Sequence, residues 1–196
     1  LRGSFRPVTK VNIDMYEKSY KMFIEENKVE EENTLVIFEI TLSNLRSEGE
    51  IDERDFMDRA ELLCSLGHTV MISNDEKYYR HLSGGILEAF GKLFYRDLKV
   101  FLYPMQDEDG TIINSENLKV HPRMKELYKF FKFNGKVIDI EEVDDKNLQI
   151  FSREVLKMIN KGKAGWENML PKGIAELIKK DHLFGYDENK ILEEAN

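Results

Sequence analysis

The first dozen residues combine a loop and a helix start in a way that could hold an anion. Gly3 and Ser4 interrupt regular structure, and Pro7 suits the first turn of a helix because its φ is fixed and it lacks an N–H. Helix N-termini bind anions such as phosphate, because their first N–H groups have no partner within the helix. An ordinary turn before a helix would have the same sequence, and spacing alone leaves both interpretations open. Helical spacing of apolar residues follows at Val11, Met15, Tyr16, Tyr20, Phe23 and Ile24.

Other residues with reactive side chains give weaker signals. Cys64 lies in an apolar helical run, which predicts a buried structural thiol rather than a nucleophile. His121 and His182 have no ligand partners at the spacing of a zinc site, so we expect no metal ligands. Trp166 could stack on a base or pack in the core. The acidic cluster at 141–145 could hold Mg²⁺ or form a solvated loop.

The composition is that of a globular protein. The chain has 196 residues, of which 41% are hydrophobic and 34% are charged, and this excludes a disordered chain. No hydrophobic run approaches the length of a membrane span, so we expect no membrane association. A net charge of −8 argues against a general nucleic-acid-binding surface. The single cysteine and the lack of a visible secretory signal indicate a reducing compartment, and we expect a cytoplasmic protein.

Hydrophobic patterning predicts an α/β fold. Buried strands and amphipathic helices alternate along the chain, and this order is typical of a mostly parallel sheet with helices on both faces. The ligand in such sheets binds beyond the carboxyl ends of the strands. The predicted strands are 34–40, 68–73, 98–103 and 135–140; the predicted helices are 11–32, 51–66, 86–96 and 117–133, with a turn or hairpin at 107–113. The loops that could hold a ligand are 3–9, 41–50, 73–85, 104–115 and 141–152.

The last quarter of the chain is expected to be helical. Ser152 suits the N-cap of a helix reaching Asn160, and a second helix should run from Leu170 to about Lys180. Leu183 and Phe184 should then fold back onto it. We expect residues 1–150 to form an α/β core and residues 151–196 a helical C-terminal segment packed on the same domain.

Two separated segments resemble the nucleotidylyltransferase superfamily, and in particular nicotinamide/nicotinate mononucleotide adenylyltransferases. The first is the loop from Gly3 to Thr9, which is similar to the family's Gly-Ser/Thr-Phe-Asn/Asp-Pro loop. Thr9 stands at the family's threonine or histidine position, and Asn12 stands at the histidine position three residues later. The second begins with Ser152 to Lys157, similar to Ser-x-Thr-x-Ile-Arg, and continues through Gly162, Leu170-Pro171 and Leu183-Phe184. The chain also resembles the C-terminal part of a longer, uncharacterised bacterial protein family that carries the same label.

This resemblance implies that residues 1–150 form a nucleotide-binding core with a Rossmann-like sheet. The first strand of that sheet is expected just before Gly3, outside the given sequence. It also implies adenylyl transfer from ATP, with Mg²⁺, to a mononucleotide such as nicotinate mononucleotide. By the resemblance, the catalytic residues are Thr9, Asn12 and Lys157, and the nucleotide-binding residues are Gly3, Ser4, Phe5, Lys10, Ser152 and Arg153. The expected partner is a small-molecule nucleotide, and the chain could form a homo-oligomer or belong to a longer chain as an N-terminal domain.

The motif departs from the family at three polar positions. Asn12 stands where a histidine is expected, Lys157 replaces an arginine, and Glu154 replaces a threonine. Loss of one charged transition-state contact can cost a factor of about 10² in rate. We therefore expect an adenylyltransferase-like enzyme with an altered catalytic motif. The alternative is a catalytically degenerate nucleotide-binding or assembly module of a larger protein.

Overall fold

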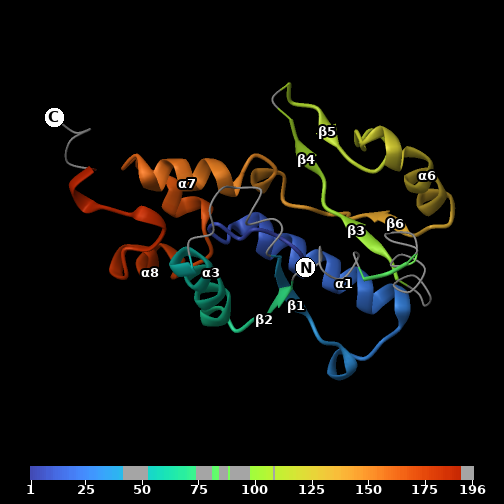
Figure 1. The fold of residues 1–196 in the computed structure, drawn as a ribbon, viewed down its shortest axis with the longest axis horizontal. Helices are drawn as coiled ribbons and strands as arrows, with labels where there is room; N and C mark the ends of the chain where they lie inside the picture. The colour runs from blue at the N-terminus through green and yellow to red at the C-terminus, as the bar shows by residue number, and fades with distance from the viewer. Residues whose placement is uncertain (42–52, 74–80, 84–87, 89–97, 108, 191–196) are drawn as a thin grey trace.

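The computed structural model describes residues 1–41, 53–73, 81–83, 88, 98–107 and 109–190 (Figure 1). The helices in this part of the chain are α1 (Lys10–Asn27), α3 (Glu53–Ser65), α6 (Lys125–Phe133), α7 (Ser152–Asn160) and α8 (Ile174–Lys180). The strands are β1 (Ile37–Thr41), β2 (Thr69–Ser73), β3 (Val100–Leu102), β4 (Met105–Gln106), β5 (Ile112–Ile113) and β6 (Val137–Asp139). Short 3₁₀ helices are η1 (Glu31–Asn33), η2 (Pro122–Met124), η3 (Asp145–Asn147), η4 (Trp166–Met169) and η5 (Leu183–Gly185).

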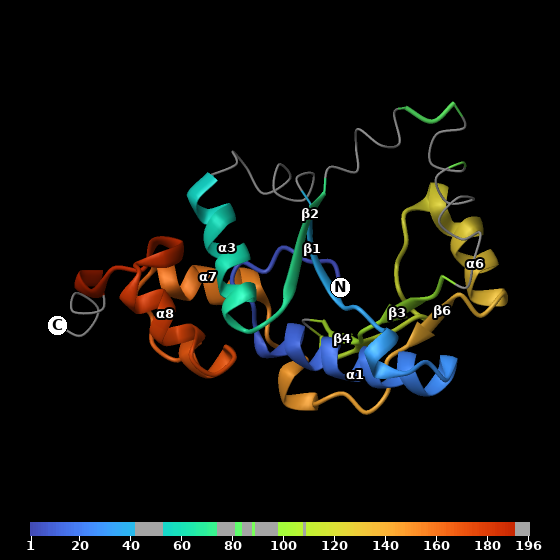
Figure 2. The ribbon, with the colours of Figure 1, turned by 90° about the horizontal axis from the view of Figure 1, so that it is seen from below.

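Two strand–helix–strand units form the frame of the molecule. β1 pairs in parallel with β2, and α3 lies between them in the chain; β3 pairs in parallel with β6, with α6 between them. β4 and β5 form an antiparallel hairpin. Figures 1 and 2 show α1 in the middle of the molecule, with α3, α7 and α8 gathered at one end and α6 at the other.

The segment from Leu1 to Gly3 extends the first parallel pair. The Glu39 N–H donates to the Leu1 carbonyl at 2.7 Å, and the Gly3 N–H donates to the Glu39 carbonyl at 3.2 Å. Arg2 thus forms a parallel bridge with Glu39 of β1. Leu1 to Gly3 therefore form an extended segment beside β1, and the loop follows its carboxyl end.

The mixed α/β class is confirmed, but one mostly parallel sheet is not what the described residues form. Within them, the strands make three separate two-stranded sheets, of which two are parallel. β3 and β6 are shorter than expected, because Pro104 cannot donate to a ladder and Gly135 adopts a left-handed turn after α6, with φ of 62°. The predicted helix at 86–96 falls almost wholly outside the described residues.

The first helix and strand also have different bounds from those predicted. α1 ends at Asn27, five residues before the expected end, because Lys28 adopts a left-handed conformation with φ of 51°. The acidic run after it forms η1, and the Thr34 N–H donates to the Glu31 carbonyl at the end of that turn. Because Thr34 closes this turn, it does not belong to the strand, and β1 starts at Ile37.

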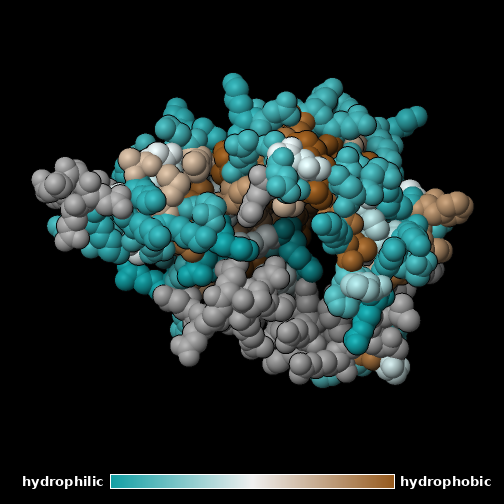
Figure 3. All heavy atoms as spheres, turned by 90° about the horizontal axis from the view of Figure 1, so that it is seen from above, coloured by the Kyte–Doolittle hydropathy of each residue, from teal (hydrophilic) through white to brown (hydrophobic). Residues whose placement is uncertain are grey.

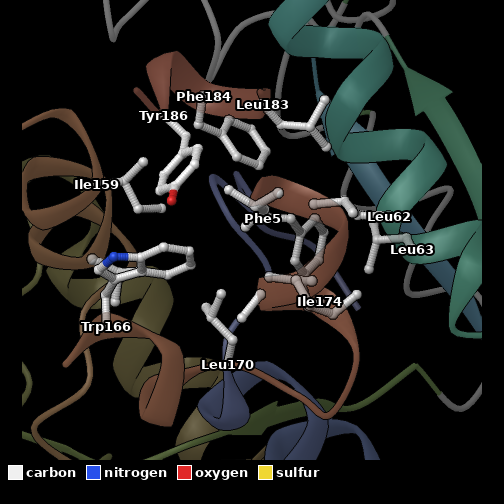
Figure 4. Packing of buried hydrophobic residues seen from close by; sticks show 14 of the residues in the cluster. Phe5, Leu62, Leu63, Ile159, Trp166, Leu170, Ile174, Leu183, Phe184 and Tyr186 are labelled. Carbon is white, nitrogen blue, oxygen red and sulfur yellow. The ribbon is translucent and has the colours of Figure 1, made fainter. Parts of the chain in front are cut away.

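The hydrophobic core joins both ends of the chain (Figure 4). Phe5, from the first loop, packs in one cluster with Leu62 and Leu63 of α3 and with Trp166 and Phe184 from the C-terminal segment. Trp166 is only 1% exposed, so the packing interpretation of this residue is confirmed. Burial of such large side chains contributes about 1.5–3 kcal/mol each, so this cluster fixes the first loop against the last helices.

The C-terminal segment is helical, as predicted, but α8 starts at Ile174, four residues after the predicted Leu170, because Gly173 before it adopts a left-handed conformation with φ of 87°. α7 has the predicted bounds, but Phe151 occupies the N-cap and Ser152 is the first helical residue. Leu183 and Phe184 are buried, as predicted. Cys64, by contrast, is exposed on α3, because Leu62 and Leu63 take the positions that face the core. No helix in the described part of the chain is both long and apolar enough to cross a membrane.

Candidate functional site

A cleft of about 1390 Å³ opens where three segments meet. They are the loop and first turn at 4–12, the β4–β5 hairpin, and the stretch that leads into α7. Three of the five loops expected to surround a ligand therefore contribute to it, and the other two, 41–50 and 73–85, lie largely outside the described residues. Figure 3 shows a largely hydrophilic face with hydrophobic residues near its middle. The cleft is lined by Ser4, Arg6, Thr9, Val11, Asn12, Met105, Gln106, Asp107, Gly110, Gln149, Ile150, Phe151, Ser152, Arg153, Glu154 and Leu156.

The loop wall is held by the side chain of Phe5. This ring is 2% exposed and lies in the core, where it contacts Phe38 with ring centroids 5.5 Å apart. A Cβ at Gly3 would lie 3.0 Å from Phe5 Cζ, so glycine at this position lets the ring lie against the backbone. Because the Phe5 ring points into the core, Ser4 is the residue of the segment 3–5 that lines the cleft.

Thr9 and Asn12 cap α1. The Asn12 side-chain oxygen accepts hydrogen bonds from the Thr9 N–H at 2.8 Å and from the Thr9 hydroxyl at 3.1 Å. This is the reciprocal arrangement of a capping box, in which the third helical residue satisfies the N-cap. Both side chains line the cleft, but their side-chain oxygens already take part in the hydrogen bonds that cap α1. The amide NH₂ of Asn12 remains the group through which this pair could contact a ligand.

α1 is also tied to the second strand–helix–strand unit. The Tyr103 hydroxyl donates to Asp14 at 2.5 Å, and the Asp144 N–H donates to the same carboxylate oxygen at 3.1 Å. Burial, followed by the hydrogen bond to Asp14, raises the pKa of Tyr103, so this hydroxyl keeps its proton. These bonds fix the start of α1 against the end of β3, from which the hairpin leaves.

The hairpin wall is built from polar side chains that hold one another. Gln149 donates to the Gln106 side-chain oxygen at 2.7 Å, and the Gln106 amide donates to the Gly110 carbonyl at 3.1 Å. Asp107 accepts from the backbone N–H groups of Asp109 and Thr111, at 3.1 and 2.8 Å. This is an Asx-type turn, and it commits one Asp107 oxygen to the hairpin.

The third wall is the first turn of α7. Ser152, Arg153 and Glu154 all line the cleft there. Lys157 donates to Glu154 at 2.7 Å across the helix surface, and this hydrogen bond lowers the pKa of Glu154. Glu154 is therefore ionised at neutral pH and is partly neutralised by Lys157. The orphan N–H groups of this turn and the Arg153 guanidinium give the wall a positive character.

A buried ionic network supports the loop from behind. Asp55 of α3 accepts from Arg6 Nε at 3.0 Å through one oxygen and from Arg59 Nε at 2.9 Å through the other. Arg59, whose side chain is 3% exposed, also donates to the Ser4 carbonyl at 3.2 Å. We did not predict this network from the sequence, although the i,i+4 spacing of Asp55 and Arg59 on a predicted helix is the signal that could have indicated it.

A second, smaller cavity adjoins the cleft. It measures about 380 Å³ and shares Arg6 and Leu156 with the cleft. Arg6 therefore stands between the two spaces. The remaining walls come from α3, the end of α7 and η5, and they consist of Arg54, Asp55, Asp58, Asn160, His182, Phe184 and Gly185.

The structure brings together part of the predicted site. Ser4, Thr9, Asn12, Ser152 and Arg153 line one cleft, although more than 130 residues separate the two groups in the chain. The other four predicted residues, Gly3, Phe5, Lys10 and Lys157, are not among the residues that line it.

Those four residues have other surroundings. Phe5 lies in the core, Gly3 packs against its ring, Lys10 is exposed, and Lys157 pairs with Glu154. Of the three residues predicted to be catalytic, Thr9 and Asn12 therefore line this cleft and Lys157 is not among its lining residues. Polar residues that we did not predict include Arg6, Gln106, Asp107 and Gln149 in the lining, and Asp55 and Arg59 behind it.

The described residues of the cleft offer few ligands to a metal ion. In the described part of the chain, no three His, Cys, Asp or Glu side chains form a group that could hold a metal ion. The carboxylates among the described lining residues are Asp107 and Glu154, which stand on different walls and already accept hydrogen bonds.

No protein-family model and no curated protein matches this chain. The functional conclusion therefore rests on the geometry of the cleft and on the sequence resemblance.

Proposed function

We propose that this chain is a nucleotidylyltransferase-like protein that binds ATP in the cleft and transfers its adenylyl group to a mononucleotide, nicotinate mononucleotide being the first candidate. One observation carries the proposal. The two segments that resemble the family, which are far apart in the chain, line a single cleft through Ser4, Thr9, Asn12, Ser152 and Arg153.

The position of the cleft supports the same proposal. Its loop wall follows the Leu1–Gly3 segment that pairs in parallel with β1, and its hairpin wall follows β3. In doubly wound α/β sheets, nucleotides bind where two neighbouring strands turn away in opposite directions. We further propose that the two parallel pairs are the halves of one Rossmann-like sheet, with this cleft at the change of direction.

The chain's own residues would act by position and charge. The N–H groups of the first turn of α7, the Ser152 hydroxyl and the Arg153 guanidinium would bind ATP phosphates. The Asn12 amide would donate a neutral hydrogen bond from the opposite wall. Adenylyl transfer needs alignment of two phosphates and stabilisation of negative charge, and bound Mg²⁺ would supply further neutralisation.

A second candidate is a nucleotide-binding module that does not catalyse transfer. Two observations favour it: Lys157 is engaged with Glu154, and the Thr9 and Asn12 oxygens are engaged in the α1 cap. In this case the cleft would bind ATP without forming pyrophosphate. The two candidates differ in catalysis and share nucleotide binding.

Isothermal titration followed by a pyrophosphate-release assay separates them. ATP-Mg²⁺ and nicotinate mononucleotide are titrated separately and together, and pyrophosphate is then measured with both present. Arg153→Gln should weaken ATP binding about tenfold or more, because it removes a charged contact. Arg123→Gln, which changes an exposed arginine of η2 outside the cleft, is the matched control. Binding without pyrophosphate would reject the enzyme, and no ATP binding would reject both candidates.

A further inference from the structure

The only two glutamines of the chain lie side by side in the cleft. Gln106 belongs to β4 and Gln149 lies just before α7, 43 residues further along the chain. Their surroundings are joined through the backbone as well, since the Gln106 N–H donates to the carbonyl of Leu148 at 3.5 Å. Leu148 is only 7% exposed, whereas both glutamines line the cleft. The pair therefore has a fixed place on the hairpin wall.

The hydrogen bonds of this pair set the direction of both side-chain amides. A backbone carbonyl can only accept, so the Gln106 amide must place its NH₂ group at the Gly110 carbonyl. The Gln106 oxygen then accepts from the NH₂ group of Gln149. Within the described part of the chain, no group donates to the side-chain oxygen of Gln149. Gln149 thus presents an oriented hydrogen-bond acceptor to the cleft.

Apolar side chains accompany both glutamines in the lining. Met105 precedes Gln106 and is 44% exposed, and Phe151 follows Gln149 by two positions and is 40% exposed. Apolar surface beside an oriented amide suits a flat heteroaromatic ring, whose faces are apolar and whose edge carries polar atoms. Stacking on an aromatic side chain tolerates every base, because every base has a π-face. The amide is therefore the group that could distinguish one base from another.

We propose that Gln149 selects the base of the nucleotide by accepting a hydrogen bond from the 6-amino group of adenine. Gln106 is a positioning residue that orients this amide, and Phe151 and Met105 contact the faces of the ring. This inference rests on the proposed function. The resemblance does not imply it, because both glutamines lie outside the two segments that are similar to the family. A 6-oxo purine would place a second acceptor against the Gln149 oxygen, and two acceptors cannot form a hydrogen bond.

Titration with ligands that differ in the base tests this assignment. Inosine triphosphate has a carbonyl oxygen where ATP has the amino group, and inorganic triphosphate has no base. We expect the wild type to bind ATP roughly tenfold more tightly than inosine triphosphate. Gln149→Leu should bind the two nucleotides equally, because it keeps the size of the side chain and removes the acceptor. Its affinity for inorganic triphosphate should equal that of the wild type.

Three further variants separate positioning from contact. Gln106→Leu leaves Gln149 its amide but removes the partner that orients it, so the preference for ATP should fall without disappearing. Phe151→Ala should weaken both nucleotides by the same factor, since stacking does not distinguish the edges of bases. Asn189→Leu removes an exposed amide that is not among the described lining residues, so this matched control should keep the wild-type preference.

Two results would overturn the inference. One is equal affinity of the wild type for ATP and inosine triphosphate; the other is a preference for ATP that Gln149→Leu retains. If the wild type does not bind ATP at all, the proposed function fails, so the two failures are distinguishable. Should Gln149→Leu not fold, nuclear magnetic resonance of the wild type decides, because glutamine labelling gives signals from two side-chain amides only. ATP must then shift the Gln149 amide signal, and an unshifted signal would reject the contact.

Discussion

Asp55 holds the side chains of Arg6 and Arg59 at the loop wall of the cleft. Its carboxylate is shared by two arginines, and one of them, Arg59, is almost fully buried. Removing one partner of a buried ion pair leaves an uncompensated charge and costs about 3–5 kcal/mol. We therefore expect Asp55→Ala to lower the free energy of unfolding by about this amount, measured by urea denaturation.

An exposed ion pair provides the control for Asp55. Glu126 pairs with Lys129 at 2.8 Å on the surface of α6, where water already solvates both charges. Glu126→Ala should leave the urea midpoint unchanged within error, because such pairs contribute little. If Asp55→Ala were as mild as Glu126→Ala, Arg59 would not depend on Asp55 and the network would not support the loop.

His68 should make the stability of the protein depend on pH. Its ring stacks on Phe38 with centroids 4.2 Å apart and meets Tyr16 edge-on, and burial lowers its pKa from the ordinary 6.5. Above pH 6.5 the ring is neutral in both states, and its contribution is fully present. Below that value the unfolded chain takes up the proton first, so stability falls until the lowered folded pKa is reached.

The measurement is the urea midpoint between about pH 7.5 and about pH 5. His68→Phe should lose less stability over this range than the wild type, since phenylalanine cannot be protonated. His121→Asn, at the exposed N-cap of η2, keeps a side-chain acceptor for the Arg123 N–H and should follow the wild-type curve. Parallel curves for the wild type and His68→Phe would show that His68 has no part in the acid sensitivity.

At the scale of elements, the start of α1 has two roles that one substitution series can separate. Asn12→Ala removes the acceptor for the Thr9 N–H and hydroxyl, so it should cost about 0.5–2 kcal/mol of stability. Asn12→Asp keeps the acceptor and adds a charge that favours a helix N-terminus, so stability should be retained. The same carboxylate should weaken ATP binding in the cleft.

Thermal denaturation and ATP titration of the same two variants supply the comparison. The order of stability should be aspartate, asparagine, alanine, while aspartate should bind ATP more weakly than asparagine. Equal stability of the wild type and both variants would mean that the capping box does not stabilise α1. Tighter ATP binding by the aspartate variant would contradict a phosphate near this turn.

Elements whose signals are local could be predicted. α7 has its predicted bounds because Val155 and Ile159 set its buried face and Gly162 follows its end. Strand ends depend on contacts that no local pattern contains. β3 stops at Leu102, where Pro104 follows and Tyr103 bonds to α1, and β1 starts late because Thr34 closes η1.

In the candidate site too, local sequence motifs could be predicted, whereas contacts between distant parts of the chain could not. The resemblance located both segments, and each contributes residues to the cleft. It could not indicate that Phe5 would enter the core or that Lys157 would pair with Glu154, since both depend on which face of a folded element is turned inward. Asp55 was missed because its importance comes from Arg6, 49 residues away in the chain.

The core predicts that the molecule unfolds as one unit. Phe5 and Trp166 belong to one buried cluster although they lie near opposite ends of the chain, and Trp166 is the only tryptophan. Phe5→Ala should cost about 3–5 kcal/mol. It should shift the urea midpoint equally whether unfolding is followed by Trp166 fluorescence or by far-ultraviolet circular dichroism.

Phe133→Ala, at a ring that is 90% exposed on α6, is the matched control and should shift neither midpoint. If Phe5→Ala moved the circular dichroism midpoint and left the fluorescence midpoint in place, the segment from 151 onward would unfold independently of the α/β part. Coincident transitions would instead mean that the loop wall and the α7 wall of the cleft are stabilised by the same core. Any substitution that loosens this core would then weaken ATP binding before it unfolds the chain, because the two walls would no longer keep their spacing.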